Sequence, residues 1–271
     1  MNNGISISYQ KHQAVQASAA LIATVNTQMG QAAQLDDQPG VDTSLGKGSV
    51  LAQDQDSFVQ LSYDPQTQAA SSFSFKAHNN IMTPDGQLVV PGGLETSMSR
   101  SDDGNLTYAQ KAPDGGSQQA VVDPQSNTIQ YAGETISDQD TQVSSTINAI
   151  VATINGQINN YAGLDEQPGV DTATGVGSVR ARDESSSVEL DYDPATGAAR
   201  HYQFEAHEDV KTPDGQTAIS KGVKTSMNLS EDGIETYSQT LPMQDGGSFT
   251  QEVSVNEKTQ TISYNEWVLK P

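Results

Sequence analysis

The chain has 271 residues and a formal net charge of −21, from 34 acidic and only 13 basic residues. A field this negative repels phosphate backbones, which argues against nucleic acid and anionic membrane surfaces as partners. The sequence contains no cysteine, which excludes disulfides, thiolate metal sites and cysteine nucleophiles.

The first predicted element is a helix over residues 14–32. Apolar and small residues recur there at the spacing of one helix face; they are Ala14, Ser18, Leu21, Ile22, Val25, Met29 and Ala32. Because several of them are small, this stripe buries less apolar area, at about 25 cal/mol per Å². We therefore expect this helix to be held loosely.

A loop with several carboxylates follows, over residues 35–50. Asp36 and Asp42 flank a Pro-Gly turn in this loop, and their later counterparts are Asp165 and Asp171. Calcium takes oxygen ligands in flexible geometry, so these four residues are candidate metal ligands. The alternative is a helix-to-strand crossover in which Asp42 and Asp171 bond their own backbone. Their spacing differs from that of a helix-loop-helix calcium site.

Strands are predicted beyond this loop, because the apolar period changes from 3.6 to 2. Residues 58–63 and 73–77 alternate apolar and polar side chains, and further candidates are 94–100, 105–111, 118–122 and 128–132. Short turns rich in Asp, Pro and Gly separate these segments, as tight hairpins require. The pattern predicts an antiparallel meander.

A second helix is predicted after residue 137, with a stronger apolar stripe. Its members are Val143, Ile147, Ile150, Val151, Ile154, Ile158 and Tyr161. Ser137 followed by Asp140 is typical of a capped helix start, with Asp138 or Asp140 as the alternative cap, and Gly163 is well placed to end the helix. This helix is expected to pack more firmly than the first.

The second half of the chain repeats the first. The segment Gln38-Pro39-Gly40-Val41-Asp42-Thr43 returns 129 residues later as Gln167-Pro168-Gly169-Val170-Asp171-Thr172, and the strand pattern returns with it. We therefore predict a tandem duplication with units at 1–133 and 134–271. The predicted fold class is α+β: each unit has one amphipathic helix followed by, and packed on, an antiparallel meander of about six or seven strands.

Two of the four histidines, His78 and His207, are repeat-equivalent, and strand alternation places them on the face opposite the nearby phenylalanines. Imidazole titrates near neutrality and can bind metal or accept a proton. With Asp42 and Asp171, these histidines are the candidate binding residues. The alternative is that each caps a strand end and bonds a nearby carbonyl. No catalytic residue is assigned, and we lean against an enzyme because the spacings of common catalytic motifs are missing.

The sequence favours a non-catalytic interaction or structural protein that presents polar, acidic sheet faces and hairpin loops to a partner. A protein or glycan is the expected partner rather than a small molecule, nucleic acid or an inserted membrane. The first alternative is a metal-dependent enzyme or binder with one His/Asp site per repeat, and the second is a small-ligand carrier. No cofactor is expected unless the loops bind calcium.

The cellular location is open from the sequence. The polar N-terminus has neither a basic segment nor a continuous apolar run of the kind found in cleaved signal peptides. Scarce basic residues and abundant Gln, Asn, Ser and Thr resemble the composition of bacterial proteins exported without a cleaved signal and of virion proteins. We therefore lean towards an extracellular or surface location, or a larger assembly, with the cytoplasm as the alternative.

Overall fold

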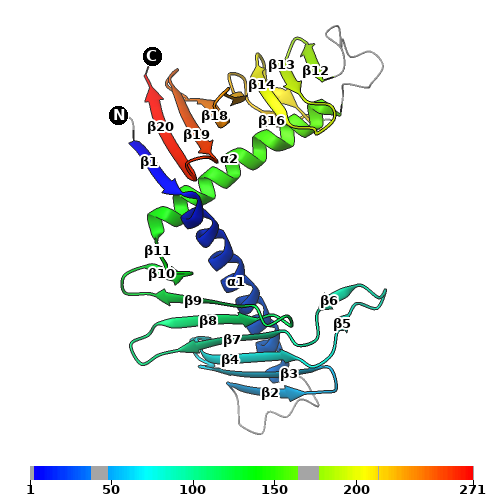
Figure 1. Ribbon diagram of the computed structural model, residues 1–271, viewed down its shortest axis with the longest axis vertical. Coiled ribbons are helices and arrows are strands. Elements are labelled where there is room, and N and C mark those ends of the chain that lie inside the picture. The colour runs from blue at the N-terminus through cyan, green and yellow to red at the C-terminus, as the bar shows by residue number, and fades with distance from the viewer. Residues whose placement is uncertain (1–2, 38–47, 164–176, 213, 271) are drawn as a thin grey trace. The chain divides into compact units, whose positions relative to one another are not determined.

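The computed structural model describes residues 3–37, 48–163, 177–212 and 214–270 (Figure 1). They form two compact units. The N-terminal unit is Lys11–Thr141, and the C-terminal unit combines Met1–Gln10 with Gln142–Pro271. The chain therefore passes between the units twice, each time near the start of an α-helix.

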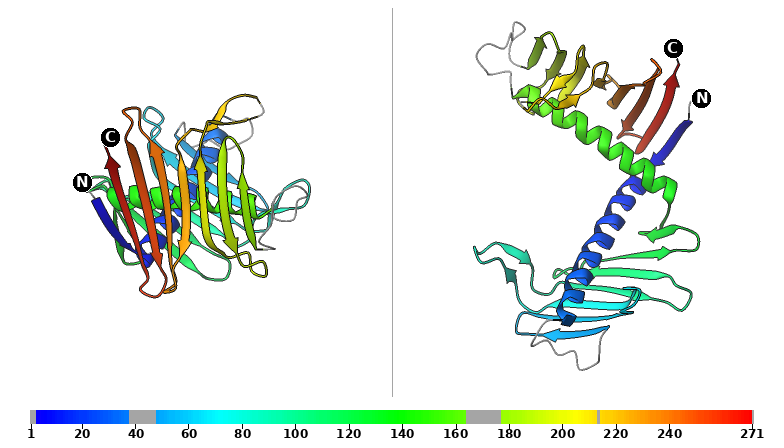
Figure 2. Two further views of the ribbon diagram at one scale, coloured as in Figure 1. Left: turned by 90° about the horizontal axis from the view of Figure 1, so that it is seen from above. Right: turned by 180° about the vertical axis from the view of Figure 1, so that it is seen from behind.

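The N-terminal unit is an eight-stranded antiparallel sheet with the helix α1 (Tyr9–Ala33) against one face (Figures 1 and 2). The strand order is β11-β10-β9-β8-β7-β4-β3-β2. A short 3-10 helix η1 (Gln34–Asp37) follows α1, and β5 (Ile81–Met82) pairs with β6 (Leu88–Val90) outside the main sheet. The strands of the main sheet are β2 (Ser49–Gln53), β3 (Ser57–Tyr63), β4 (Ala70–Ala77), β7 (Glu95–Arg100), β8 (Leu106–Lys111), β9 (Ser117–Asp123), β10 (Thr128–Tyr131) and β11 (Glu134–Ser137).

The C-terminal unit has the same plan, with α2 (Asp138–Ala162) against a sheet ordered β1-β20-β19-β18-β17-β14-β13-β12. A second two-stranded ribbon joins β15 (Val210–Lys211) to β16 (Thr217–Ile219). The strands of the main sheet are β1 (Asn3–Ser8), β12 (Ser178–Arg182), β13 (Ser186–Tyr192), β14 (Ala199–Ala206), β17 (Lys224–Leu229), β18 (Ile234–Pro242), β19 (Ser248–Asn256) and β20 (Thr261–Leu269).

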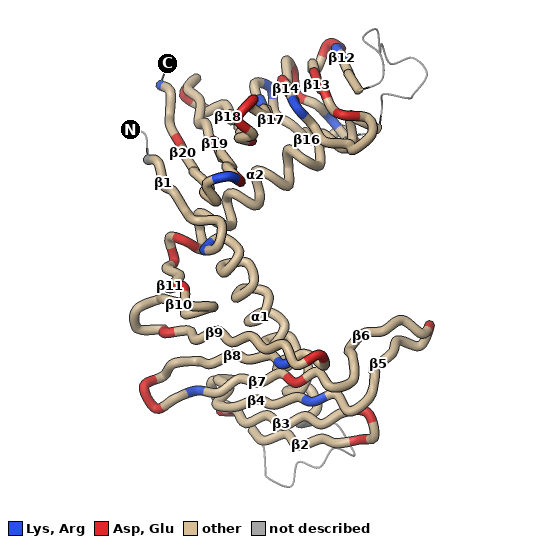
Figure 3. Tube along the Cα trace, in the orientation of Figure 1, with Lys and Arg blue, Asp and Glu red and all other residues tan. Residues whose placement is uncertain are grey.

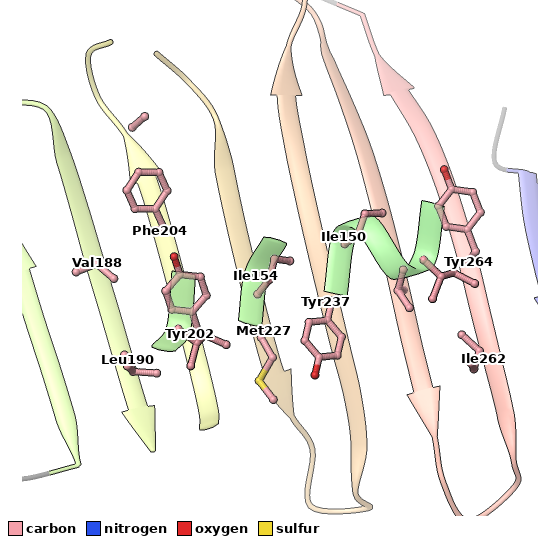
Figure 4. Packing of buried hydrophobic residues seen from close by; sticks show 14 of the residues in the cluster. Ile150, Ile154, Val188, Leu190, Tyr202, Phe204, Met227, Tyr237, Ile262 and Tyr264 are labelled. Atoms are coloured by element: carbon pink, nitrogen blue, oxygen red, sulfur yellow. The ribbon is translucent and has the colours of Figure 1, made fainter. Parts of the chain in front are cut away.

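The core of each unit lies between its helix and its sheet. In the C-terminal unit the apolar stripe of α2 packs on large side chains from five strands (Figure 4). Ile154 is 0% exposed and lies over this face, whose members include Val188, Leu190, Tyr202, Phe204, Met227, Tyr237 and Ile262. The corresponding stripe of α1 contains smaller residues, and Ala32 stands where α2 has Tyr161. The second helix therefore carries the larger apolar stripe.

The predicted helix start at Ser137 is confirmed by its hydrogen bonds. The Ser137 backbone N–H and hydroxyl donate to Oδ2 of Asp140 at 2.8 and 2.7 Å, and the Asp140 N–H donates to the Ser137 hydroxyl at 3.2 Å. Burial opposes ionisation of Asp140, but the Ser137 bonds and the Lys11 ammonium 3.0 Å away outweigh it and lower the pKa of the carboxyl. This reciprocal pair is a capping box with aspartate in place of glutamate.

The predicted fold class was wrong. The described residues are mostly β, with 48% in strands, two α-helices and two sheets of eight strands rather than six or seven. A repeated unit of one helix followed by a meander is not what the chain builds, because each sheet also contains a strand that directly precedes a helix: β1 in one and β11 in the other. The assignment of residues 1–133 and 134–271 as domains stays a prediction.

These two strands are inconspicuous in the sequence for physical reasons. The first has only two apolar side chains facing the core, Ile5 and Ile7, and the second has Ile136. Alternation over four to six residues is too short to distinguish a strand from a polar terminus or a linker. Their place in the sheets depends on pairing with β20 and β10, which is tertiary information.

Candidate functional site

The repeated histidines have matching backbone contacts in the two units. The His78 N–H donates to the carbonyl of Asp56, and the His207 N–H donates to that of Ser185, both at 2.7 Å. The His78 side chain is exposed, whereas that of His207 is half-buried with its Nε2 3.1 Å from Oγ of Ser187. These contacts anchor the backbone at the end of each strand; a binding role for the two side chains stays a prediction.

The candidate metal ligands fall mostly outside the described residues. Asp42, Asp165 and Asp171 lie in the two segments that are not described, and Asp36 lies in η1. Among the residues that are described, no group of three or more His, Asp or Glu side chains is arranged to hold a metal ion. Calcium binding by the loops is untested by this structure and stays a prediction.

A group of charged side chains lies on the outward face of the C-terminal sheet, on the side away from α2, over β12, β13, β14 and β17. We call it the outer charged face. Strand alternation produces it, because inward residues such as Val179 and Leu190 are completely buried while their neighbours point outward. Its members are Arg180, Glu189, Asp191, Glu205, His207 and Lys224. The predicted binding residue His207 therefore belongs to a larger polar surface.

Arg180 organises one half of the outer charged face. Its guanidinium donates to both carboxylate oxygens of Asp191 at 3.0 Å and lies 3.7 Å from the Glu189 carboxylate. The Ser178 hydroxyl donates a further bond of 2.6 Å to Asp191. The Arg180 hydrogen bond, followed by that of Ser178, lowers the pKa of Asp191. Both bonds to Asp191 come from Nη2, while Nη1 donates to the backbone carbonyls of Val179 and Leu190 at 2.9 and 3.0 Å, so the guanidinium is held in one position.

Lys224 and Glu205 form the other half, with 2.9 Å between the ammonium and the carboxylate. The Lys224 hydrogen bond lowers the pKa of Glu205. In the N-terminal unit the equivalent pair has its charges reversed, with Lys76 on β4 and Glu95 on β7 at 2.8 Å. Duplicated positions have thus kept an ion pair while exchanging its two partners.

The rest of the two outward faces differs in chemistry. Where the C-terminal unit has Arg180, the N-terminal unit has Leu51, which is 36% exposed. Where the C-terminal unit has Glu189 and Asp191, the N-terminal unit has Gln60 and Ser62. Many other acidic residues lie at turns between strands in both units (Figure 3). The two sheets therefore have the same strand arrangement but chemically different outward surfaces.

Buried polar pairs link each helix to its sheet at equivalent positions, and sequence analysis missed them. The Thr96 hydroxyl donates to Gln28 of α1 at 2.5 Å, and the Thr225 hydroxyl donates to Gln157 of α2 at 2.7 Å. Tyr202 also donates to Gln157, at 3.2 Å. The available signal was a polar residue kept in both repeats at a core-facing position. A buried hydroxyl that is hydrogen-bonded avoids the cost of an unpaired one.

A tyrosine and a glutamine side chain also hydrogen-bond to each other next to the edge strand β11 of one sheet and next to the edge strand β1 of the other. Tyr131 donates to Gln118 at 2.8 Å, and Gln251 donates to Tyr264 at 2.7 Å. Tyr264 donates in turn to the carboxylate of Glu266, and burial together with this bond raises the pKa of Tyr264 to about 12. These are repeat-equivalent pairs, which extend the retained polar positions across the sheet.

Three cavities accompany these features. One of about 330 Å³ lies beside Gln118 and Tyr131, and one of about 370 Å³ lies beside Arg180 of the outer charged face and Arg182 of the same strand. The third, of about 230 Å³, is a partly open cavity between α1 and the sheet next to Gly30. All are near or below the lower end of the volume range that small-molecule sites occupy, about 300–1,000 Å³.

Comparison with known proteins does not assign this chain to a family. No known protein family matches the sequence, and neither does any curated protein. Among solved structures, the di-domain ARO/CYC StfQ from the steffimycin biosynthetic pathway aligns over all of this chain and 85% of its own, with 10% identity and a TM-score of 0.16. That likeness is too weak to support an argument about fold or function.

Neither helix of the described residues is long and apolar enough to cross a membrane. The kind of partner is not determined by this finding.

Proposed function

We propose that this chain is a non-catalytic interaction protein, in which the outward faces of the two sheets and their hairpin turns contact a protein or glycan partner. The supporting observation is where its polar groups lie. The helix-facing side of each sheet is filled mainly by apolar packing, so the accessible polar and charged groups of the sheets lie on their outward faces and at the turns.

The outer charged face of the C-terminal unit is the favoured contact surface. Its ion pairs are only partly exposed, with 37% of the Arg180 side chain and 39% of the Asp191 side chain accessible. Held in pairs, these side chains lose little further conformational freedom when a partner binds, which lowers the entropic cost of association. The cavity beside Arg180 and Arg182 adds a concave element to an otherwise open sheet.

The unlike chemistry of the two outward faces supports one contact surface rather than two identical ones. A partner that recognises Arg180 and Asp191 meets Leu51 and Ser62 at the equivalent places of the N-terminal unit. Specificity is a difference in affinity between such surfaces. We therefore expect one binding event per chain at this surface.

The test exchanges residues between repeats. The paired variant Arg180→Leu with Asp191→Ser gives the C-terminal unit the N-terminal residues, and it removes Asp191 together with its cation. The Glu189 carboxylate that also faces Arg180 is 55% exposed, so water can solvate it in the variant. Wild type and variant are probed on an array of neutral and acidic oligosaccharides and with immobilised polylysine. We expect a probe that binds wild type to lose at least tenfold in affinity, or about 1.4 kcal/mol.

The reverse exchange, Leu51→Arg with Ser62→Asp, is the matched control and should leave binding by the C-terminal unit unchanged. Equal binding by wild type and the Arg180/Asp191 variant would place the contact elsewhere. Failure of every probe to bind wild type at millimolar concentration would contradict recognition of these glycan and basic classes.

A further inference from the structure

The strands β1 and β11 occupy equivalent places in the two sheets. Each leads directly into a helix, β1 into α1 and β11 into α2. Ile7 pairs with Ile262 of β20, and Ile136 pairs with Ile129 of β10. Both inward isoleucines are buried, at 4% and 1% exposure. Because the register is the same in both sheets, β20 and β10 each accept a strand at an equivalent edge position, which we call a slot.

The two slots differ in how the chain reaches them. The β10–β11 pair is a hairpin closed by Ala132 and Gly133, whose φ angles of 52° and 85° are those of a tight primed turn. The β1–β20 pair joins residues about 250 positions apart, so its closure costs more entropy than a hairpin does. During synthesis, β1 also has no partner strand until β20 has been translated.

Without β1, the edge of β20 is a ready acceptor for a strand. The six residues Thr261–Glu266 lose their Cα partners, and the apolar cover that Ile5, Ile7 and Tyr9 give to the core is removed. The bond of 2.9 Å from the Tyr9 N–H to the Gln260 carbonyl is lost as well. An edge with unpaired backbone groups and uncovered apolar side chains is a site for strand addition.

We propose that β20 forms an interface between two copies of this chain, in which the β1 strand of one copy pairs with β20 of the other. The incoming strand has the alternation that the slot requires, with Ile5 and Ile7 inward and Ser6 outward. The exchange keeps both compact units and changes only how they are joined, at the two crossings Gln10–Lys11 and Thr141–Gln142. All native pairings are kept, and only the identity of the donor chain changes.

The N-terminal slot does not take part, because β11 is tied to β10 by its two-residue turn. A local strand has a far higher effective concentration than a distant one. The β1 strand of the same chain competes at an effective concentration on the order of millimolar. Exchange is therefore expected when chains fold together at high concentration and should be rare when they fold dilute.

The test uses disulfide capture in a chain that has no cysteine of its own. Ser6 pairs with Ser263, so Ser6→Cys and Ser263→Cys are made in separate chains. The two variants are unfolded, mixed, refolded and oxidised, and cross-linked dimer is measured on a non-reducing gel. Refolding at about 100 μM should place on the order of a tenth of chains in cross-linked dimer, with less on dilution.

The matched control is the same experiment in the other slot. Gln130 pairs with Thr135 in the corresponding register positions, and Gln130→Cys and Thr135→Cys are placed in separate chains. This mixture should give at least several-fold less cross-linked dimer, because the hairpin forms within each chain. Equal yields from the two mixtures at every concentration would overturn the proposal.

A second measurement applies if the cysteine variants do not fold. Wild-type chain is refolded at about 10 and 200 μM, diluted to the same concentration, and its mass is measured by light scattering. A dimer fraction that is larger after concentrated refolding and persists on dilution supports exchange. A monomer in both samples would overturn it.

Discussion

At the residue scale, the capping pair at the start of α2 gives a pH-dependent prediction. Replacing Ser137 by Ala should cost about 1 kcal/mol of unfolding free energy, because Asp140 loses its partner at the helix start. The pKa of Asp140 is lowered in the folded state, so its contribution is present above its ordinary value of 3.8 and is lost as the pH falls through the lowered pKa. The deficit of the variant should shrink in acid.

Urea unfolding at neutral pH and again below the lowered pKa measures this effect. Thr146→Ala is the control, because Thr146 is partly exposed on the same helix, away from its capped start, and its hydroxyl donates to the carbonyl of Gln142 four residues earlier. A deficit for Ser137→Ala that is the same at both pH values would show that ionisation of Asp140 contributes nothing.

The loop aspartates give a prediction about metal. If Asp42 and Asp171 hold calcium, the melting temperature should rise by several degrees in millimolar calcium over EDTA, since a ligand at 100 times its Kd adds about 2.7 kcal/mol. If His78 and His207 bind metal instead, micromolar zinc should raise the melting temperature, and His78→Gln with His207→Gln should abolish that rise. A calcium rise that Asp42→Asn and Asp171→Asn abolish would assign the ligands, whereas coincident curves would remove the calcium interpretation.

At the element scale, each helix contains a glycine with room for a side chain. Nothing lies within 4 Å of where a Cβ would stand on Gly30 of α1 or Gly156 of α2. Glycine in a helix is less stable than alanine by roughly 0.5–1 kcal/mol. Gly30→Ala and Gly156→Ala should each raise the free energy of unfolding by that amount, as measured by thermal or urea unfolding.

Gly48→Ala is the contrasting variant. Gly48 has a φ of 95°, and a Cβ there would lie 2.6 Å from the carbonyl oxygen of Tyr63. This substitution should destabilise the protein, because it is strained in both backbone and contact. A loss of stability for Gly30→Ala or Gly156→Ala would contradict the open space found around these two glycines.

The elements differed in how far they could be predicted. The α2 stripe from Val143 to Ile158 is regular and apolar, so its period identified the helix. The retained pairs Thr96–Gln28 and Thr225–Gln157 were not predicted, because a polar residue in an alternating strand gives no sign of which partner satisfies it. His207 was singled out, but its hydrogen-bond partner Ser187 comes from another strand and reaches it only through the pairing of β13 with β14.

At the scale of the whole molecule, the two units should respond separately to equivalent substitutions. Ile7→Ala and Ile136→Ala remove the same buried side chain from β1 and β11, and each should cost about 2–5 kcal/mol locally. By hydrogen exchange, Ile7→Ala should reduce protection at Thr261–Glu266 and leave β10 unchanged. Ile136→Ala should do the reverse. Loss of protection in both sheets from either variant would show that the units unfold together.

The place of β1 beside β20 has a consequence for chain connectivity. Asn3 pairs with Glu266, so the two ends of the chain run side by side in one sheet. A short peptide joining the ends would turn this pair into a hairpin like β10–β11, and the chain could then be opened at Gly133 instead. In that circular permutant each helix would still follow its own strand, but the chain would begin with β11 and finish with β10. The order of the elements along the gene is therefore separable from the fold that they form.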